Sequence, residues 1–137
     1  SFCLICVLFW LWLCHAVFVC GSLQNLGNQS SGKNSVLNVT EYVIPLSENA
    51  RKRHYHESDE GKVACFSVQL EVFFNNSWQV VIRYDASHGF THIDQYKIDG
   101  RKVKRELHLS LSEALTFADE DIKENWKLYQ KRFLEGK

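Results

Sequence analysis

The stretch from residue 78 to residue 94, WQVVIRYDASHGFTHID, gathers side chains that can carry out acid–base chemistry. It holds two histidines, two aspartates and one arginine around a single glycine. Histidine titrates near neutral pH, and the planar guanidinium of arginine matches the oxygens of a phosphate. The candidate site residues of the chain are Arg83, Asp85, His88, His92 and Asp94.

Three roles fit this cluster. In the first, His88 and His92 act as general acid and base while Arg83 stabilises charge on a phosphate, which suits metal-independent RNA cleavage. In the second, the two histidines and the two aspartates bind a divalent metal such as zinc or manganese, although their spacing is not a standard metal motif. In the third, the groups are structural: Arg83 pairs with Asp85 or Asp94, and the histidines cap turn carbonyls.

The residues on either side of the cluster predict a sheet that positions it. Apolar and polar residues alternate along 63–74, as in a half-buried strand. Residues 78–85 form its partner after a tight connection, and the turn signal Asp99-Gly100 separates two further strands at 90–98 and 101–109.

Alternation along the second strand decides which side chains face the core. Trp78, Val80, Ile82 and Tyr84 are predicted to share the apolar face, which turns Arg83 and Asp85 away from it. If the second and third strands pair across the short turn at Gly89, His92 and Asp94 lie beside Arg83 and Asp85 on the open face of the sheet.

A helix is predicted to close the domain. Ser110 and Glu113 form a capping box, and Gly136 is a plausible stop. An apolar stripe at helical spacing is made by Leu115, Ala118, Ile122, Trp126, Tyr129 and Phe133. The predicted fold class is therefore α+β: an antiparallel four-stranded meander sheet with one C-terminal helix packed on one face, leaving the other open.

The first forty residues are set apart from the single α+β domain predicted at 41–137. Residues 1–20 are uncharged and almost wholly apolar, and residues 21–40 have the composition of a polar linker. The apolar leader is a membrane segment, a signal peptide or a spurious translation of non-coding sequence, and the absence of methionine favours the third interpretation. Four of the five cysteines lie in this leader. A cytoplasmic location is therefore predicted for the domain, with anchoring in a membrane through 1–20 as the alternative.

The net charge of the chain is zero, so bulk charge gives no general affinity for nucleic acid, and any such affinity depends on local patches. Two groups of charged residues are interpreted as structural. His54 and His56 lie in the charge-rich segment 48–62, which is predicted to be an exposed segment that leads into the first strand. The basic run at 101–105 is predicted to protect a sheet edge from pairing.

The motif W-x-V-V-x-R-Y-D-x-x-H-G-F-x-H-x-D, from Trp78 to Asp94, resembles that of a small prokaryotic family of unknown function. In this chain the motif is followed by a predicted helix with the pattern E-A-L-x-x-A-x-x-D-x-x-x-N-W, from Glu113 to Trp126, and the resemblance to the family includes that helix. The shorter pattern R-Y-D-x-x-H-G-x-x-H, from Arg83 to His92, is similar to the core of TumE-type toxins of toxin–antitoxin systems. That resemblance implies a cytoplasmic toxin acting on RNA and held by a cognate antitoxin, with Arg83, Asp85, His88 and His92 as the matching positions. Ile93-Asp94 departs from the toxin pattern.

Two functions follow from these observations. The leading hypothesis is a toxin-like RNA-cleaving protein that uses the histidine, arginine and aspartate side chains. The alternative is a non-catalytic interaction or structural module in which the same segment forms a rigid turn.

Overall fold

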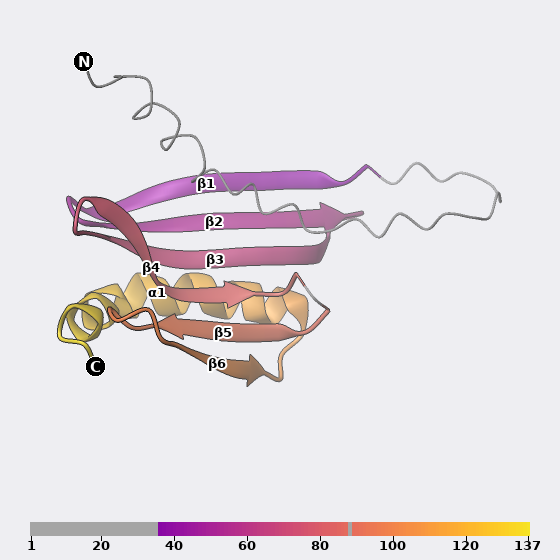
Figure 1. Ribbon diagram of the computed structural model, residues 1–137. Coiled ribbons are helices and arrows are strands. Elements are labelled where there is room, and N and C mark those ends of the chain that lie inside the picture. Colours follow the sequence, from indigo (N-terminus) through magenta and orange to yellow (C-terminus); the bar gives the residue numbers. More distant parts are fainter. Residues whose placement is uncertain (1–35, 88) are drawn as a thin grey trace, which may run out of the picture.

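The computed structural model describes residues 36–87 and 89–137 of the chain. They form one antiparallel sheet in which every strand pairs with its neighbour in sequence, and one long helix lies behind the sheet in the view of Figure 1. The strands are β1 (Asn38–Ser47), β2 (Ala50–Asp59), β3 (Lys62–Phe74), β4 (Ser77–Asp85), β5 (Thr91–Tyr96) and β6 (Lys102–Leu107), and the helix is α1 (Leu111–Leu134).

The α+β class and the C-terminal helix are confirmed, but the sheet has six strands and the prediction of four is wrong. β1 and β2 precede the predicted strands, and β2 falls in the segment 48–62 that was expected to be exposed. Both faces of β2 carry polar side chains that bond to carboxylates: Arg51 to the buried Glu71 on one face, and Lys52 to the partly buried Asp119 on the other. Hydrophobic periodicity therefore does not reveal this strand.

The core lies between α1 and the middle strands. The helix packs mainly on β3 and β4, and two of its inward residues, Ala114 and Ala118, are small enough to let it approach the sheet closely. The largest fully buried side chains are Tyr84, Phe66, Leu70, Ile82, Ile122, Val68 and Val72. The opposite face of the sheet is left without a covering element among the described residues, and we call it the open face.

The predicted start of the helix is confirmed. Ser110 is the N-cap, its hydroxyl accepts from the backbone N–H of Glu113, and the Glu113 carboxylate accepts from the backbone N–H of Ser110. Hydrogen bonds from Ser110 hold the pKa of Glu113 below its usual value. The predicted apolar stripe is also the face that packs on the core.

A bulge in β4 overturns part of the predicted alternation. Leu70 pairs with Ile82, but its neighbour Glu71 pairs with Val80, so Val81 is the extra residue. Ile82 and Tyr84 face the helix as predicted. Val80 and Trp78 lie beyond the bulge and fall on the open face, where Trp78 retains 36% exposure. A one-residue shift reverses the face of every residue before it.

β6 is less buried than its pattern predicts. Alternation along 101–109 predicts that Val103 and Leu109 point into the core, but they are 56% and 40% exposed. The reason is the position of the helix, which packs on β3, β4 and β5 but not substantially on the edge strand.

The apolar segment 1–20 lies outside the described residues, and its three interpretations stay predictions. β1 begins at Asn38, inside the segment predicted as linker. No helix within residues 36–87 and 89–137 has the length and apolar character needed to span a bilayer.

Candidate functional site

The pairing of β4 with β5 brings most of the predicted site residues together. Arg83 lies opposite Asp94, and Asp85 lies opposite His92. All four are on the open face, so the predicted placement of these side chains away from the helix is confirmed. His88 lies outside the described residues.

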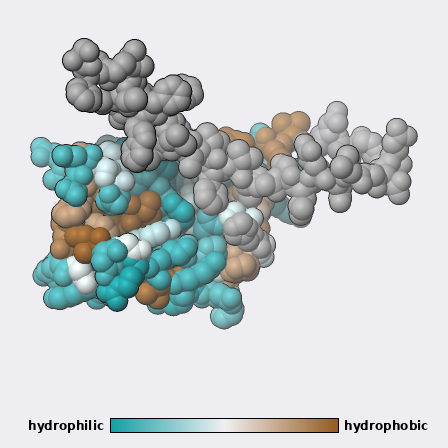
Figure 2. Space-filling view, viewed as in Figure 1, coloured by the Kyte–Doolittle hydropathy of each residue, from teal (hydrophilic) through white to brown (hydrophobic). Residues whose placement is uncertain are grey.

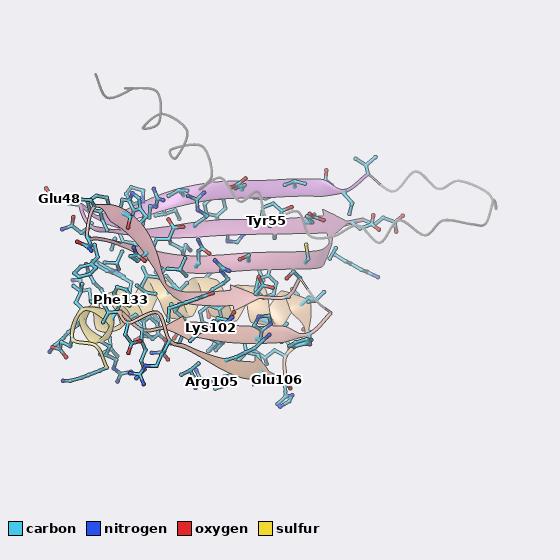
Figure 3. The ribbon with its side chains drawn as sticks, viewed as in Figure 1. Glu48, Tyr55, Lys102, Arg105, Glu106 and Phe133 are labelled. Atoms are coloured by element: carbon cyan, nitrogen blue, oxygen red, sulfur yellow. The ribbon has the colours of Figure 1, made fainter. Side chains whose placement is uncertain are left out.

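Strand β6 completes the cluster from the other side. Lys102 pairs with Tyr96 and Lys104 pairs with Asp94, so both lysines share the open face with His92. The Lys102 Nζ is 3.3 Å from Asp94 Oδ2, and His92 Nε2 is 3.7 Å from the same oxygen. Figure 3 labels Lys102, at the start of β6.

These side chains line a hollow of about 170 Å³ on the open face, which we call the cationic hollow. Its walls are Arg83, Asp85, Ser87, His92, Asp94, Tyr96, Lys102 and Lys104. Three cations against two carboxylates give it an excess of positive charge, which favours an anionic ligand.

Two atoms of this site are buried without a hydrogen-bond partner among the described residues. They are Nδ1 of His92 and Oδ1 of Asp94, which belong to side chains that are almost fully buried. A buried polar atom that lacks a partner costs free energy, and such atoms are found where a ligand or substrate supplies the missing bond.

Asp85 has a different role from the other residues. Its Oδ1 accepts from both the backbone N–H and the hydroxyl of Ser87, two residues later in the chain. This is the pattern of a side chain that closes a turn, and it fixes the start of the connection between β4 and β5.

Arg83 is oriented from the side of β3. Its Nε donates to Gln69 Oε1 at 2.8 Å, and the Gln69 amide donates in turn to Glu71. Glu71 also accepts from Arg51 and Arg53. Burial opposes ionisation of Glu71, but the hydrogen bond from Arg51, together with those from Gln69 and Arg53, outweighs it and holds the pKa of this carboxyl below its usual value.

The metal-binding role finds no support in the described residues, which contain no group of three or more histidine, cysteine or acidic side chains placed to hold a metal ion. Within the cluster, the ammonium of Lys102 lies beside the Asp94 carboxylate that a metal would need.

Lys102, Lys104 and Tyr96 belong to the site, yet the sequence interpretation assigned the basic run only to edge protection. The missed signal is the register of the hairpin. Counting outward from the Asp99-Gly100 turn pairs Lys102 with Tyr96 and Lys104 with Asp94, which places the lysines beside the predicted site.

A second cluster of titratable groups lies on the helix-facing side of β2. His54 is buried, its Nδ1 is 3.1 Å from Asp119 Oδ1, and its Nε2 is 2.8 Å from Nδ1 of His56. Lys52 Nζ donates to the same oxygen of Asp119 at 2.6 Å. The prediction that His54 and His56 belong to an exposed segment is therefore wrong. His54 links the sheet to the helix through Asp119, and His56 bonds to His54.

Comparison with known proteins gives a family and no function. No curated protein and no solved structure matches the chain. The resemblance to TumE-type toxins stays a prediction. A model of a family described as a domain of unknown function, DUF7718, matches residues 34–137, which include all six strands, the helix and the cationic hollow. The chain belongs to the DUF7718 family.

Proposed function

We propose that the cationic hollow binds a phosphodiester of RNA and cleaves it. The observation that carries this proposal is the position of His92, whose imidazole lines the same hollow as Arg83, Lys102 and Lys104. Its Nε2 lies 3.7 Å from Asp94 Oδ2, and its Nδ1 has no hydrogen-bond partner among the described residues. An imidazole next to several cations is the arrangement that general acid–base catalysis at a phosphate requires.

The reaction uses the 2′-hydroxyl of the RNA as its nucleophile. His92 takes the proton from this hydroxyl, the oxygen attacks the adjacent phosphorus, and the bond from phosphorus to the 5′-oxygen of the next nucleotide breaks. The leaving oxygen takes up a proton, for which His88 is the predicted donor. The products are a 2′,3′-cyclic phosphate and a free 5′-hydroxyl, and the three cations stabilise the negative charge that develops on the phosphate oxygens.

The test is cleavage of single-stranded RNA by the purified chain and by His92→Gln. We expect His92→Gln to lower the rate by about 100-fold or more, as loss of a general acid or base does. The matched control is His108→Gln, because His108 is exposed after the end of β6 and does not line the hollow. Unchanged cleavage in His92→Gln would overturn the assignment.

The toxin hypothesis adds a test in cells. Expression of the chain alone should arrest growth, His92→Gln should remove the arrest, and co-expression of a cognate antitoxin encoded by a neighbouring gene should relieve it. If the chain cleaves RNA in vitro but its expression does not affect growth, the toxin hypothesis is wrong and only the RNA-cleaving activity stands.

One observation favours the non-catalytic alternative. Asp85 is committed to closing the turn through Ser87, so at least one of the predicted site residues has a structural role. Under this alternative His92→Gln lowers the melting temperature, and neither the parent chain nor the variant cleaves RNA.

A further inference from the structure

The sheet splits on one side of the cationic hollow. Pairing between β4 and β5 runs from Asp85–His92 to Ile82–Gln95, whereas β4 stays paired with β3 as far as Ser77. The first half of β4 and the turn that follows β5 therefore separate. Figure 1 shows the β5–β6 hairpin diverging from β4 toward the end where β3 turns into β4.

A second hollow occupies this split. Its volume is about 410 Å³, within the range of small-ligand pockets. Its walls include Phe74, Trp78, Gln79, Tyr96, Ile98 and Phe133, and we call it the aromatic hollow. Figure 2 shows hydrophobic side chains gathered at this end of the face with hydrophilic ones around them, and Figure 3 labels Phe133 at the same end.

Tyr96 joins the two hollows because it lines both of them. The guanidinium carbon of Arg83 lies 5.9 Å from the centre of the Tyr96 ring, and Lys102 Nζ lies 5.8 Å from it. The phenol ring thus separates the two hollows. The cations lie on the side of the cationic hollow, and the other aromatic side chains lie on the side of the aromatic hollow.

We propose that the aromatic hollow binds a nucleobase of the RNA strand whose phosphate occupies the cationic hollow. This inference rests on the proposed function and specifies its substrate as single-stranded RNA with accessible, unstacked bases. Aromatic rings bind bases by stacking whatever their sequence, and a base in a duplex does not expose its faces.

The polar residues of the aromatic hollow fit the same ligand. The amides of Asn75 and Gln79 can each donate to and accept from the edge of a base, although the Gln79 amide already gives one N–H to Ser77 Oγ at 2.6 Å. Lys97 is the one charged residue in its lining within the described chain, and there is no carboxylate to repel the phosphates. One face of the Trp78 ring carries Arg51, whose guanidinium carbon is 4.0 Å from the ring centre, so the indole is held in place before a base arrives.

The test compares two strands that share a backbone. One is a short single-stranded 2′-O-methyl RNA, which lacks the nucleophile and is not cleaved, and the other is an abasic strand of the same length and charge. Affinity is measured by fluorescence anisotropy at one salt concentration for the full chain, Trp78→Leu and Phe117→Ala. Leucine keeps the apolar contact but removes the ring, and Phe117 is an exposed aromatic residue on the helix that serves as the matched control.

We expect the parent chain to prefer the strand with bases, and Trp78→Leu to lose about 5- to 150-fold in affinity for that strand, the range given by stacking of a single base. Its affinity for the abasic strand should not change, and Phe117→Ala should behave as the parent. Equal affinity of the parent for both strands, or an unchanged preference in Trp78→Leu, overturns this inference while leaving phosphate binding intact. If neither strand binds, the proposed function fails as well.

Discussion

Arg83 and Asp94 lie opposite each other on β4 and β5, and each is held by a strand on its far side. Arg83 Nε donates to Gln69 of β3, while Asp94 Oδ2 lies 3.3 Å from Lys102 of β6. The guanidinium and the carboxylate are thus positioned from opposite sides of the cationic hollow. The flanking strands β3 and β6 therefore help to position the site residues of β4 and β5.

The lysines of β6 should contribute to RNA binding through charge. We predict that Lys102→Ala and Lys104→Ala each weaken binding of a non-cleavable single strand. Each should reduce the slope of log affinity against log salt by about 0.7, the value for one phosphate contact to a single strand. Lys127→Ala is the control, since Lys127 is an exposed residue of α1. An unchanged slope in both β6 variants would show that the lysines do not contact phosphates.

The sequence is sufficient to predict the half of the fold whose residues alternate clearly. β3 to β6, the capping box and the placement of Arg83, Asp85, His92 and Asp94 on one face all follow from period-two alternation and turn residues. The first two strands cannot be predicted in this way. The polar side chains of β2 find their hydrogen-bond partners in Glu71 and Asp119, and Asp119 lies 67 positions along the chain from its partner Lys52. Such partners are not visible in a local pattern.

The site was predicted only in part, for a related reason. The bulge at Val81 moves Trp78 to the open face, and nothing in the alternation of 78–85 marks it. Lys102 and Lys104 enter the site through pairing with β5, so their role depends on hairpin register. A prediction based on the cluster alone finds the acid–base residues and misses the cations beside them.

Removal of the Glu71 charge should destabilise the domain. Its side chain is only 7% exposed and accepts from Arg51, Arg53 and Gln69. We predict that Glu71→Gln lowers the free energy of unfolding by about 1–3 kcal/mol, because it removes the negative charge beside Arg51 and Arg53 and replaces one of the two acceptor oxygens with a donor. Urea denaturation measures the loss, and Glu106→Gln on the exposed edge strand should change stability by less than about 0.5 kcal/mol.

The same carboxyl should make stability depend on acid pH. The pKa of Glu71 is lower in the folded chain than its usual value, so the folded state binds this proton less readily than the unfolded state. The stabilisation is present above the unfolded pKa of about 4.3 and is lost as the pH falls through the lower folded pKa. We expect Glu71→Gln to lose less stability than the parent chain over that interval. Parallel losses would contradict the shift.

The link between β2 and the helix should depend on the Asp119 charge. Burial opposes ionisation of Asp119, but hydrogen bonds from His54 and Lys52 outweigh it and keep its pKa below the usual value. We predict that Asp119→Asn destabilises the domain by about 1–3 kcal/mol, since Lys52 and His54 are buried and lose their charged acceptor. A double-mutant cycle with His54→Gln should show coupling of about 0.5 kcal/mol or more. The exposed neighbour Glu120→Gln is the control.

Two tyrosines that share one carboxylate should resist ionisation at alkaline pH. The hydroxyls of Tyr84 and Tyr129 both donate to Asp121 Oδ2. Burial, together with this carboxylate, raises the pKa of Tyr129 to about 12 and raises that of Tyr84 as well. The unfolded tyrosines ionise near pH 10, so the neutral hydroxyls stabilise the fold fully below that pH and the stabilisation is lost as the pH rises through the folded values.

The alkaline prediction can be checked by spectrophotometric titration of phenolate absorbance. In the parent chain, Tyr84 and Tyr129 should ionise above the ordinary tyrosine pKa of about 10, and unfolding should accompany their ionisation. Asp121→Asn removes the negative charge but keeps an oxygen acceptor, so both pKa values should fall while burial still holds them above 10. Identical titration curves for the parent and Asp121→Asn would show that burial alone sets these pKa values. A single transition near pH 10 in the parent would mean that the hydroxyls are not held in the core as the structure shows.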